Sequence, residues 1–156
     1  MGQDIRDQLR RDREEVLAGL EALGAAGIVR ACALDRLAEL RRCWKVHVLT
    51  REAVVYRALE GADATAATVA DAEHRLVENK TVNAMFDRLS NTHPGSLTWH
   101  ARLDVARQTI ERHLENESGL GLRLESRLSI EALHDLSEQY QLVREKLSVL
   151  EDAKAA

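Results

Sequence analysis

Residues 37–58 of the chain read LAELRRCWKVHVLTREAVVYRA, and the side chains that recur at every third or fourth position are mostly apolar. Residues three or four apart are neighbours on the surface of an α-helix, so this spacing predicts one buried side. We expect a single amphipathic helix over about residues 29–59. The side chains on its inner side are Leu37, Leu40, Trp44, His47, Arg51, Val55 and Ala58.

The same spacing predicts four further helices, over about residues 4–23, 64–89, 96–118 and 129–152. Glycine residues and the Pro94–Gly95 pair separate these segments, which is typical of helix ends and turns. Asp63 and Ser96 are expected to cap the third and fourth helices through their side-chain oxygens. Aromatic residues make up only 3% of the chain and proline occurs once, so strands are not expected.

These helices predict an all-α fold: an up-down-up-down four-helix bundle over about residues 4–118 with an additional C-terminal amphipathic helix over about residues 129–152. A chain of 156 residues corresponds to a single domain, residues 1–156. The C-terminal helix has the most regular apolar seam, and we expect it to pack across the bundle or against a second subunit in a homodimer. The seam consists of Leu133, Leu136, Tyr140, Val143, Leu147 and Leu150.

Charge and composition argue against several partners and compartments. The net charge is −4 and no block of basic residues occurs, so neither nucleic acid nor an anionic membrane is expected as a partner. No apolar run approaches the ~18–20 residues of a membrane span. Cys32 and Cys43 are predicted to lie about 16 Å apart on one helix, too far for a disulfide bond. Two free thiols favour a cytoplasmic location.

Ionisable side chains interrupt the apolar sides of several predicted helices. His47 and Arg51 lie one turn apart on the second helix, and His113 and Glu117 lie one turn apart on the fourth. His74 lies on the inner stripe of the third helix, with Glu78 at the edge of the stripe. Buried groups of this kind need partners, which are usually a metal, an anion or each other. The stripe of the third helix consists of Ala67, Ala70, His74, Val77, Thr81 and Met85.

The arrangement resembles the hemerythrin family, or HHE cation-binding domains, which are four-helix bundles that hold a non-haem di-iron centre. Two positions depart from the family pattern, because Arg13 stands where the family has its first histidine and Arg51 stands where it has a bridging glutamate. A guanidinium group has no lone pair to offer a metal, so the resemblance implies a degenerate centre with at most one metal. The resemblance covers nearly the whole chain. The motifs that carry it are Asp12-Arg13, His47-x-x-x-Arg51-Glu52, Glu73-His74 and His113-x-x-x-Glu117.

What the resemblance implies is a metal site on the third and fourth helices. His74, His113 and Glu117 would be the ligands, and His47 would complete the site or hydrogen-bond a bound water. Two histidines and one carboxylate suit non-haem iron or zinc, and the function would be binding or sensing. The further candidates for ligands or ion-pair partners are Glu52 and Glu78.

Two alternatives stay open at this point. In the first alternative, no cofactor binds and the bundle is a scaffold or partner-binding module. Arg51 would then pair with Glu117, and Arg13 with Glu78 or Asp12. In the second, the protein is a mononuclear metal enzyme that acts on a small anionic molecule held by Arg13 and Arg51, because guanidinium groups match carboxylates and phosphates. The sequence assigns no reaction.

Overall fold

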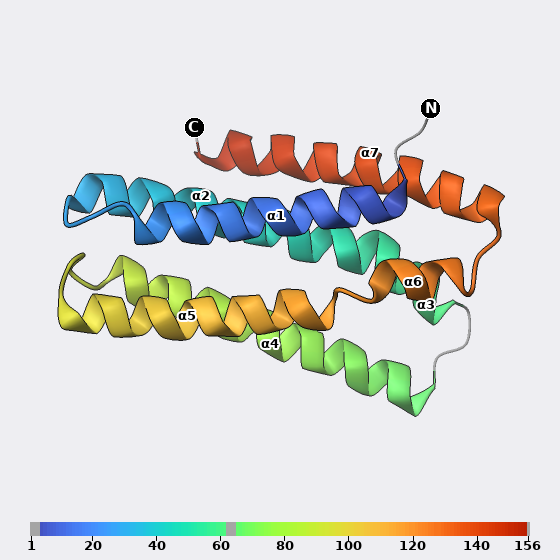
Figure 1. Cartoon of the computed structure of the whole chain (residues 1–156), viewed down its shortest axis with the longest axis horizontal. Coiled ribbons are helices and arrows are strands. Elements are labelled where there is room, and N and C mark those ends of the chain that lie inside the picture. Colours follow the sequence, from blue (N-terminus) through green and yellow to red (C-terminus); the bar gives the residue numbers. More distant parts are fainter. Residues whose placement is uncertain (1–3, 62–64, 156) are drawn as a thin grey trace.

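The structure is a computed structural model that describes residues 4–61 and 65–155, and every regular element in these residues is a helix. The all-α prediction is therefore confirmed for the described part of the chain (Figure 1). The short α6 was not expected from the sequence. The elements are α1 (Ile5–Gly24), α2 (Arg30–Thr50), the π-helix η1 (Arg51–Tyr56), α3 (Arg57–Glu60), α4 (Ala66–Ser90), α5 (Leu97–Asn116), α6 (Leu120–Glu125) and α7 (Ile130–Ala155).

The long helices lie side by side as a bundle, and successive ones run in alternating directions (Figure 1). α1 packs against α2 and α5, and α4 packs against α2 and α5. The last helix, α7, lies along α1, α2 and η1 of its own chain. Of the two placements expected for the apolar seam, packing across the bundle is the one that the structure shows, and it buries Leu136 and Tyr140.

Local signals in the sequence account for the helix ends. Ser96 begins α5, and its hydroxyl oxygen accepts the backbone N–H of Trp99 at 3.1 Å, as predicted. Gly61 ends the α2–η1–α3 helix with a φ of +61°, a conformation that glycine adopts without steric cost. The helix cap predicted at Asp63 lies outside the described residues. Thr65 begins α4 instead, in a capping box with Thr68.

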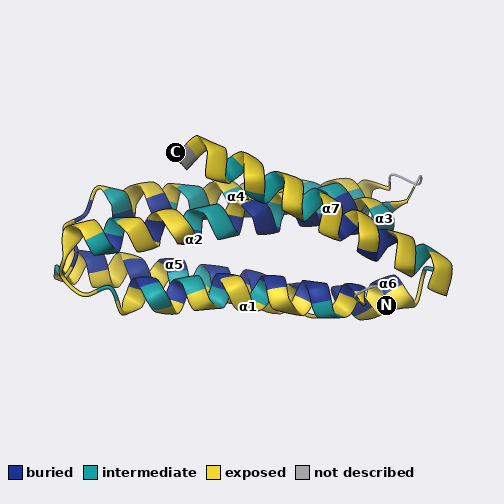
Figure 2. Ribbon diagram, turned by 90° about the horizontal axis from the view of Figure 1, so that it is seen from above, coloured by how far each residue is buried: buried dark blue, intermediate teal, exposed yellow. Residues whose placement is uncertain are grey.

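The core consists of two apolar clusters that follow one another along the bundle. The first is built from the C-terminal half of α1, α2, the C-terminal half of α4 and α5, and Trp44 and Trp99 are its largest side chains. The second is built from the start of α1, η1, α3, α6 and α7, around Tyr140. Figure 2 shows buried residues on the sides of the helices that face one another. α4 contributes to the first cluster only.

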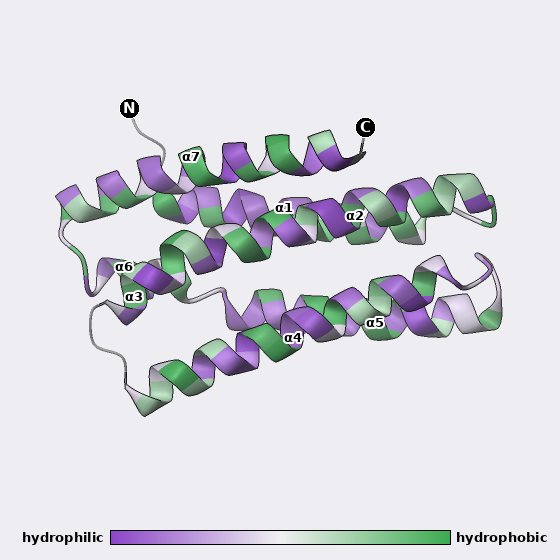
Figure 3. Cartoon of the chain, turned by 180° about the vertical axis from the view of Figure 1, so that it is seen from behind, coloured by the Kyte–Doolittle hydropathy of each residue, from purple (hydrophilic) through white to green (hydrophobic). Residues whose placement is uncertain are grey.

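The inner side predicted for α4 is wrong. The residues that enter the core are Val82, Phe86 and Leu89, whereas His74 and Val77 of the predicted stripe are exposed. Hydrophobic residues occur on more than one side of α4, since Val69, Leu76 and Val77 are exposed. Figure 3 shows that hydrophobic and hydrophilic residues are mixed along the side of α4 that is seen from behind. Spacing alone therefore fits two stripes, and contact with α2 and α5 selects the one that is buried.

Two further sequence expectations concern membrane-spanning helices and the two cysteine residues. None of the helices in the described residues is long and apolar enough to cross a membrane. Cys32 and Cys43 are both free, as the helix spacing predicted, and both are half-buried.

Candidate functional site

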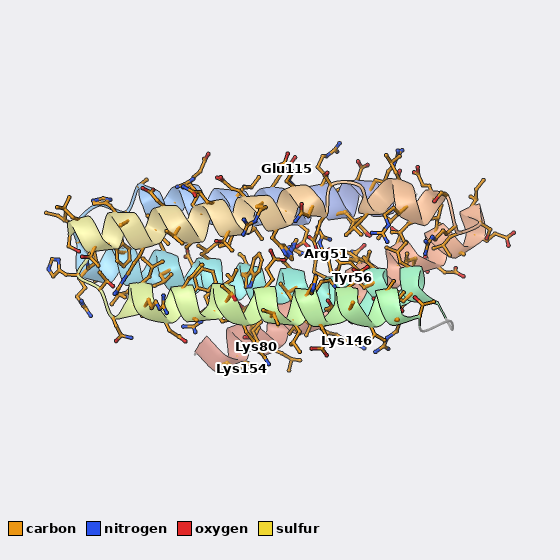
Figure 4. The ribbon with its side chains drawn as sticks, turned by 90° about the horizontal axis from the view of Figure 1, so that it is seen from below. Arg51, Tyr56, Lys80, Glu115, Lys146 and Lys154 are labelled. Atoms are coloured by element: carbon orange, nitrogen blue, oxygen red, sulfur yellow. The ribbon has the colours of Figure 1, made fainter. Side chains whose placement is uncertain are left out.

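A layer of polar side chains separates the two apolar clusters. Its five central members come from α1, α2, η1 and the C-terminal end of α5, and between 0% and 9% of each residue's surface is exposed. Figure 4 shows Arg51 and Tyr56 in the interior between the helices, whereas Glu115 lies on the outside. Burying so many ionisable groups is costly unless they are paired, so the contacts within the layer decide what it can do. The five central residues are Asp12, His47, Arg51, His113 and Glu117.

The Glu117 carboxylate accepts hydrogen bonds from several side chains of this polar layer. Its Oε2 accepts hydrogen bonds from Nε of Arg51 at 2.7 Å and from Nε2 of His47 at 2.9 Å. Its Oε1 accepts the hydroxyl of Tyr56 at 2.8 Å. Burial acts to raise the pKa of the Glu117 carboxyl, but the neighbouring His113, His47 and Arg51 outweigh burial and hold the pKa well below its usual value. Glu117 is therefore a carboxylate.

The π-helix η1 allows two of its residues to hold the same carboxylate. Arg51 and Tyr56 are five residues apart, and in an α-helix residues at that separation point about 140° away from each other. The i→i+5 turn of a π-helix brings them to one side, where both donate to Glu117. The apolar spacing predicts a continuous α-helix over this region and does not reveal the π-helix, because the spacing on either side of it is ordinary.

Asp12 anchors the other end of the polar layer. Its Oδ2 accepts Nδ1–H of His47 at 3.1 Å and the hydroxyl of Tyr140 at 2.7 Å, and its Oδ1 accepts Nε of Arg144 at 3.2 Å. Burial acts to raise the pKa of Asp12, yet His47, Arg51 and Tyr140 together lower it far below its usual value. Both ring nitrogens of His47 thus face carboxylate oxygens.

The resemblance places Arg13 at the inner, ligand-bearing position of α1, and the structure places Asp12 there instead. Asp12 is 3% exposed and Arg13 is half-buried. Both residues lie three or four positions from the buried Leu9 and Val16, so the spacing fits either one. α2 and α7 pack against α1 on the side that holds Asp12. The Asp12 carboxylate gains its partners on those helices.

His113 has one satisfied and one unsatisfied ring nitrogen. Its Nδ1 contacts Oε2 of Glu78 on α4 at 2.6 Å. Its Nε2 lies 3.4 Å from Oε1 of Glu117 and has no hydrogen-bond partner, the only such atom among the buried side-chain nitrogens and oxygens of the described residues. Burial disfavours the charged imidazole, but the carboxylates of Glu117 and Glu78 outweigh burial and raise the pKa of His113. The ring of Trp44 packs edge-on against it, with 4.9 Å between the centroids.

Three of these side chains could share one metal ion. His47, His113 and Glu117 each offer a ligand atom, and the three atoms lie within 4.8 Å of one another. Two ligands of one zinc ion, each about 2.0–2.2 Å from it, lie roughly 3–3.5 Å apart, which the spacing of His113 and Glu117 matches. Asp12 and Glu78 contact the two histidines at Nδ1, and carboxylates commonly hold metal-binding imidazoles in place in this way.

His74 does not join this set. Its side chain is exposed on α4, because the inner side of that helix is different from the predicted one. His74 lies instead at a cavity of about 740 Å³, whose lining also includes Tyr56, Glu78, His113 and Glu117. The cavity connects the polar layer with the surface between α4 and α5.

The ion pairs expected for a metal-free interior are present in part. Arg51 pairs with Glu117, as predicted. The predicted pairing of Arg13 with Glu78 or Asp12 is wrong, because Glu78 contacts His113 and Asp12 contacts other groups. Glu52 points away from the polar layer and accepts two hydrogen bonds from Arg75 of α4. The guanidinium of Arg75 lies 3.7 Å from the centre of the Tyr56 ring and so holds that ring beside Glu117.

A second and smaller cavity reaches Glu117 from the opposite side. It has a volume of about 260 Å³, and Arg13 and Arg51 both lie in its wall, as the proposed anion site requires. The Glu117 carboxylate therefore lies between a cavity that contains His113 and a cavity rich in arginine.

Comparison with known proteins adds no relative. A scan against protein-family models, a search of curated proteins and a search of solved structures each found no match. The hemerythrin resemblance rests on the sequence motifs alone and stays a prediction.

Proposed function

We propose that the protein is a metal-binding helical bundle that holds one divalent ion through His47, His113 and Glu117. The observation that carries the proposal is the unpartnered Nε2 of His113, which is buried and faces a carboxylate. An unsatisfied nitrogen in this position costs free energy in the absence of a ligand. A metal ion that displaces its proton would bind the lone pair of this nitrogen.

The charge of the site supports the same proposal. Three carboxylates, Asp12, Glu78 and Glu117, meet the guanidinium groups of Arg51 and Arg144 and the two imidazoles. Each proton that a divalent ion displaces from an imidazole offsets one unit of the positive charge that the ion brings. Exchange of protons for the metal ion therefore lowers the cost of adding charge to a buried site.

The donor set narrows the identity of the ion and its role. Two imidazoles and one carboxylate suit iron, zinc or manganese, and Arg51 in place of a bridging carboxylate disfavours a second ion beside the first. When bound, the ion would supply Lewis acidity and a coordination position for a small molecule. Tyr56 and Arg51 hold Glu117 in place by hydrogen bonds. The 740 Å³ cavity provides access for a small molecule.

Metal titration of single-residue variants tests the proposal. Zinc, and ferrous iron under nitrogen, should bind to the wild-type protein in a 1:1 ratio by isothermal titration calorimetry. His47→Ala, His113→Ala and Glu117→Ala should each weaken binding by about 100-fold or more, whereas Glu78→Gln should weaken it by about 10–100-fold because it only orients His113. His74→Ala is the matched control, since this exposed histidine lies at the same cavity.

Two results would overturn the proposal. One is absence of metal binding to the wild-type protein, which would favour the metal-free scaffold built on the Arg51–Glu117 pair. The other is a His74→Ala variant that loses metal binding while His47→Ala retains it, which would return the site to the ligand set expected from sequence alone.

A further inference from the structure

We propose that the smaller cavity beside Glu117 binds a free oxyanion of phosphate size. Its wall includes four arginines, three from α1 and one from η1, and a single carboxylate, that of Glu117. The volume of about 260 Å³ fits a small ion rather than a chain or a nucleotide. The four arginines are Arg6, Arg10, Arg13 and Arg51.

Arg51 forms the fixed part of this anion site. Its side chain is 4% exposed, and it donates to Glu117, to the hydroxyl of Tyr140 and to the backbone carbonyl of Leu9. These bonds hold the guanidinium plane in one orientation at the inner end of the cavity. Glu117 already accepts three hydrogen bonds from neighbouring groups, so its charge is largely compensated on that side.

Arg13 is the residue whose role is otherwise unexplained. It is half-buried, and across residues 4–61 and 65–155 its guanidinium forms neither a hydrogen bond nor an ion pair. The donors of a partly buried guanidinium need acceptors, and an anion would supply them. The anion would lie between the movable guanidinium group of Arg13 and the guanidinium group of Arg51, which is fixed by its hydrogen bonds.

Arg6 and Arg10 complete the positive side of the cavity. Together with Arg13 they recur at intervals of four and three residues, so all three lie on one side of α1. Like charges at this spacing destabilise a helix slightly, and a bound anion relieves the repulsion. Both arginines also form ion pairs on the surface, with Glu125 at 2.8 Å and with Asp7 at 2.9 Å. Exposed pairs of this kind are weak and exchange readily for a better partner.

The chemistry favours a doubly charged oxyanion over other ligands. Planar guanidinium groups donate in pairs to the oxygens of phosphates and carboxylates. Several guanidinium groups around one small cavity suit two negative charges better than one. The chain as a whole carries a charge of −4, which opposes the approach of long polyanions. The proposal does not depend on the metal site, because none of the four arginines is a metal ligand.

Phosphate binding to metal-free protein tests the inference. Inorganic phosphate titrated at low ionic strength, in a buffer without chloride, should bind in a 1:1 ratio by calorimetry and should shift the ³¹P resonance. Arg13→Gln should weaken binding by about tenfold or more, since one charge-assisted contact is lost. Arg11→Gln is the matched control, because Arg11 neighbours Arg13 in sequence but lies at a different cavity, beside Asp12 and Glu15. The control should bind phosphate as the wild type does.

Further measurements separate the outcomes. Acetate should bind about tenfold more weakly than phosphate if two charges are recognised, and equal affinity would overturn the choice of a dianion. Circular dichroism and the unfolding midpoint of Arg13→Gln should match the wild type, since the side chain has no protein partner to lose. Absence of phosphate binding to the wild type, or equal weakening by Arg11→Gln, would overturn the anion site. Metal titration of the same samples shows separately whether the proposed metal site binds an ion.

Discussion

At the scale of single residues, the carboxylate of Glu117 contacts side chains from α2, η1 and α5. Glu117 receives hydrogen bonds from Arg51, His47 and Tyr56, and the Nε2 of His113 lies nearby without one. The sequence of one helix does not reveal this arrangement, because the partners of Glu117 come from α2, η1 and α5. The sequence did predict the Arg51–Glu117 pair, since both side chains lie on apolar stripes and carry opposite charges.

Removal of one member of that pair should be far more harmful than removal of both. Glu117→Leu leaves the guanidinium of Arg51 buried without its carboxylate, and Arg51→Leu leaves Glu117 with fewer donors. Each single change should lower the free energy of unfolding by about 3–5 kcal/mol, and the double variant should lose much less than the sum. Urea unfolding of the metal-free proteins at neutral pH measures the coupling. Additive losses would mean that the two charges do not depend on each other.

At the scale of helices, apolar spacing predicted some faces and failed at others for identifiable reasons. His113 and Glu117, which are expected on the inner side of the fourth helix, are both buried at the C-terminal end of α5. The spacing was ambiguous on α1, where Asp12 and Arg13 fit equally, and on α4, where apolar residues occur on more than one side. The π-helix leaves no mark in the spacing, because a widened turn shifts the stripe by only one residue.

Two valines on α4 provide a direct test of its corrected orientation. Val82 is fully buried in the first apolar cluster, and Val77, five residues earlier, is 59% exposed. Val82→Ala should lower the free energy of unfolding by about 2 kcal/mol, because apolar area is lost and a cavity remains. Val77→Ala should change it by less than about 0.5 kcal/mol. Thermal or urea unfolding compares the pair, and a larger loss for Val77→Ala would restore the orientation predicted from the sequence.

At the scale of the whole molecule, the polar layer makes stability depend on pH in both directions. The pKa values of Asp12 and Glu117 lie below their usual values of 3.8 and 4.5, so the unfolded chain takes up protons before the folded one does. The stabilisation from these carboxylates is present above that range and is lost as the pH falls below it. His113 has a raised pKa, so its stabilisation is complete below 6.5 and is lost as the pH rises through the raised value.

We therefore expect the metal-free protein to be most stable between about pH 5 and 6.5. Stability should fall by about 1.4 kcal/mol per pH unit for each proton that the folded and unfolded states bind differently. Urea midpoints at pH 3.5, 5.5 and 8.5 measure both limbs. Glu117→Gln should flatten the acid limb and His113→Gln the alkaline limb. A profile that His113→Gln leaves unchanged above pH 6.5 would show that this histidine does not titrate with folding.

The position of the polar layer between the two apolar clusters also restricts how the helices can be aligned. If α2 or α5 slid by one turn, about 5.4 Å, an ionic side chain would enter one of these clusters. A leucine or valine would then face the remaining unpaired charges. Each misaligned arrangement would strand at least one charge, so a single alignment is selected during folding. A variant with this layer rebuilt entirely from aliphatic residues would lose that selection. We expect it to unfold at a higher temperature and to sample several helix alignments, visible as broadened amide resonances in NMR spectra.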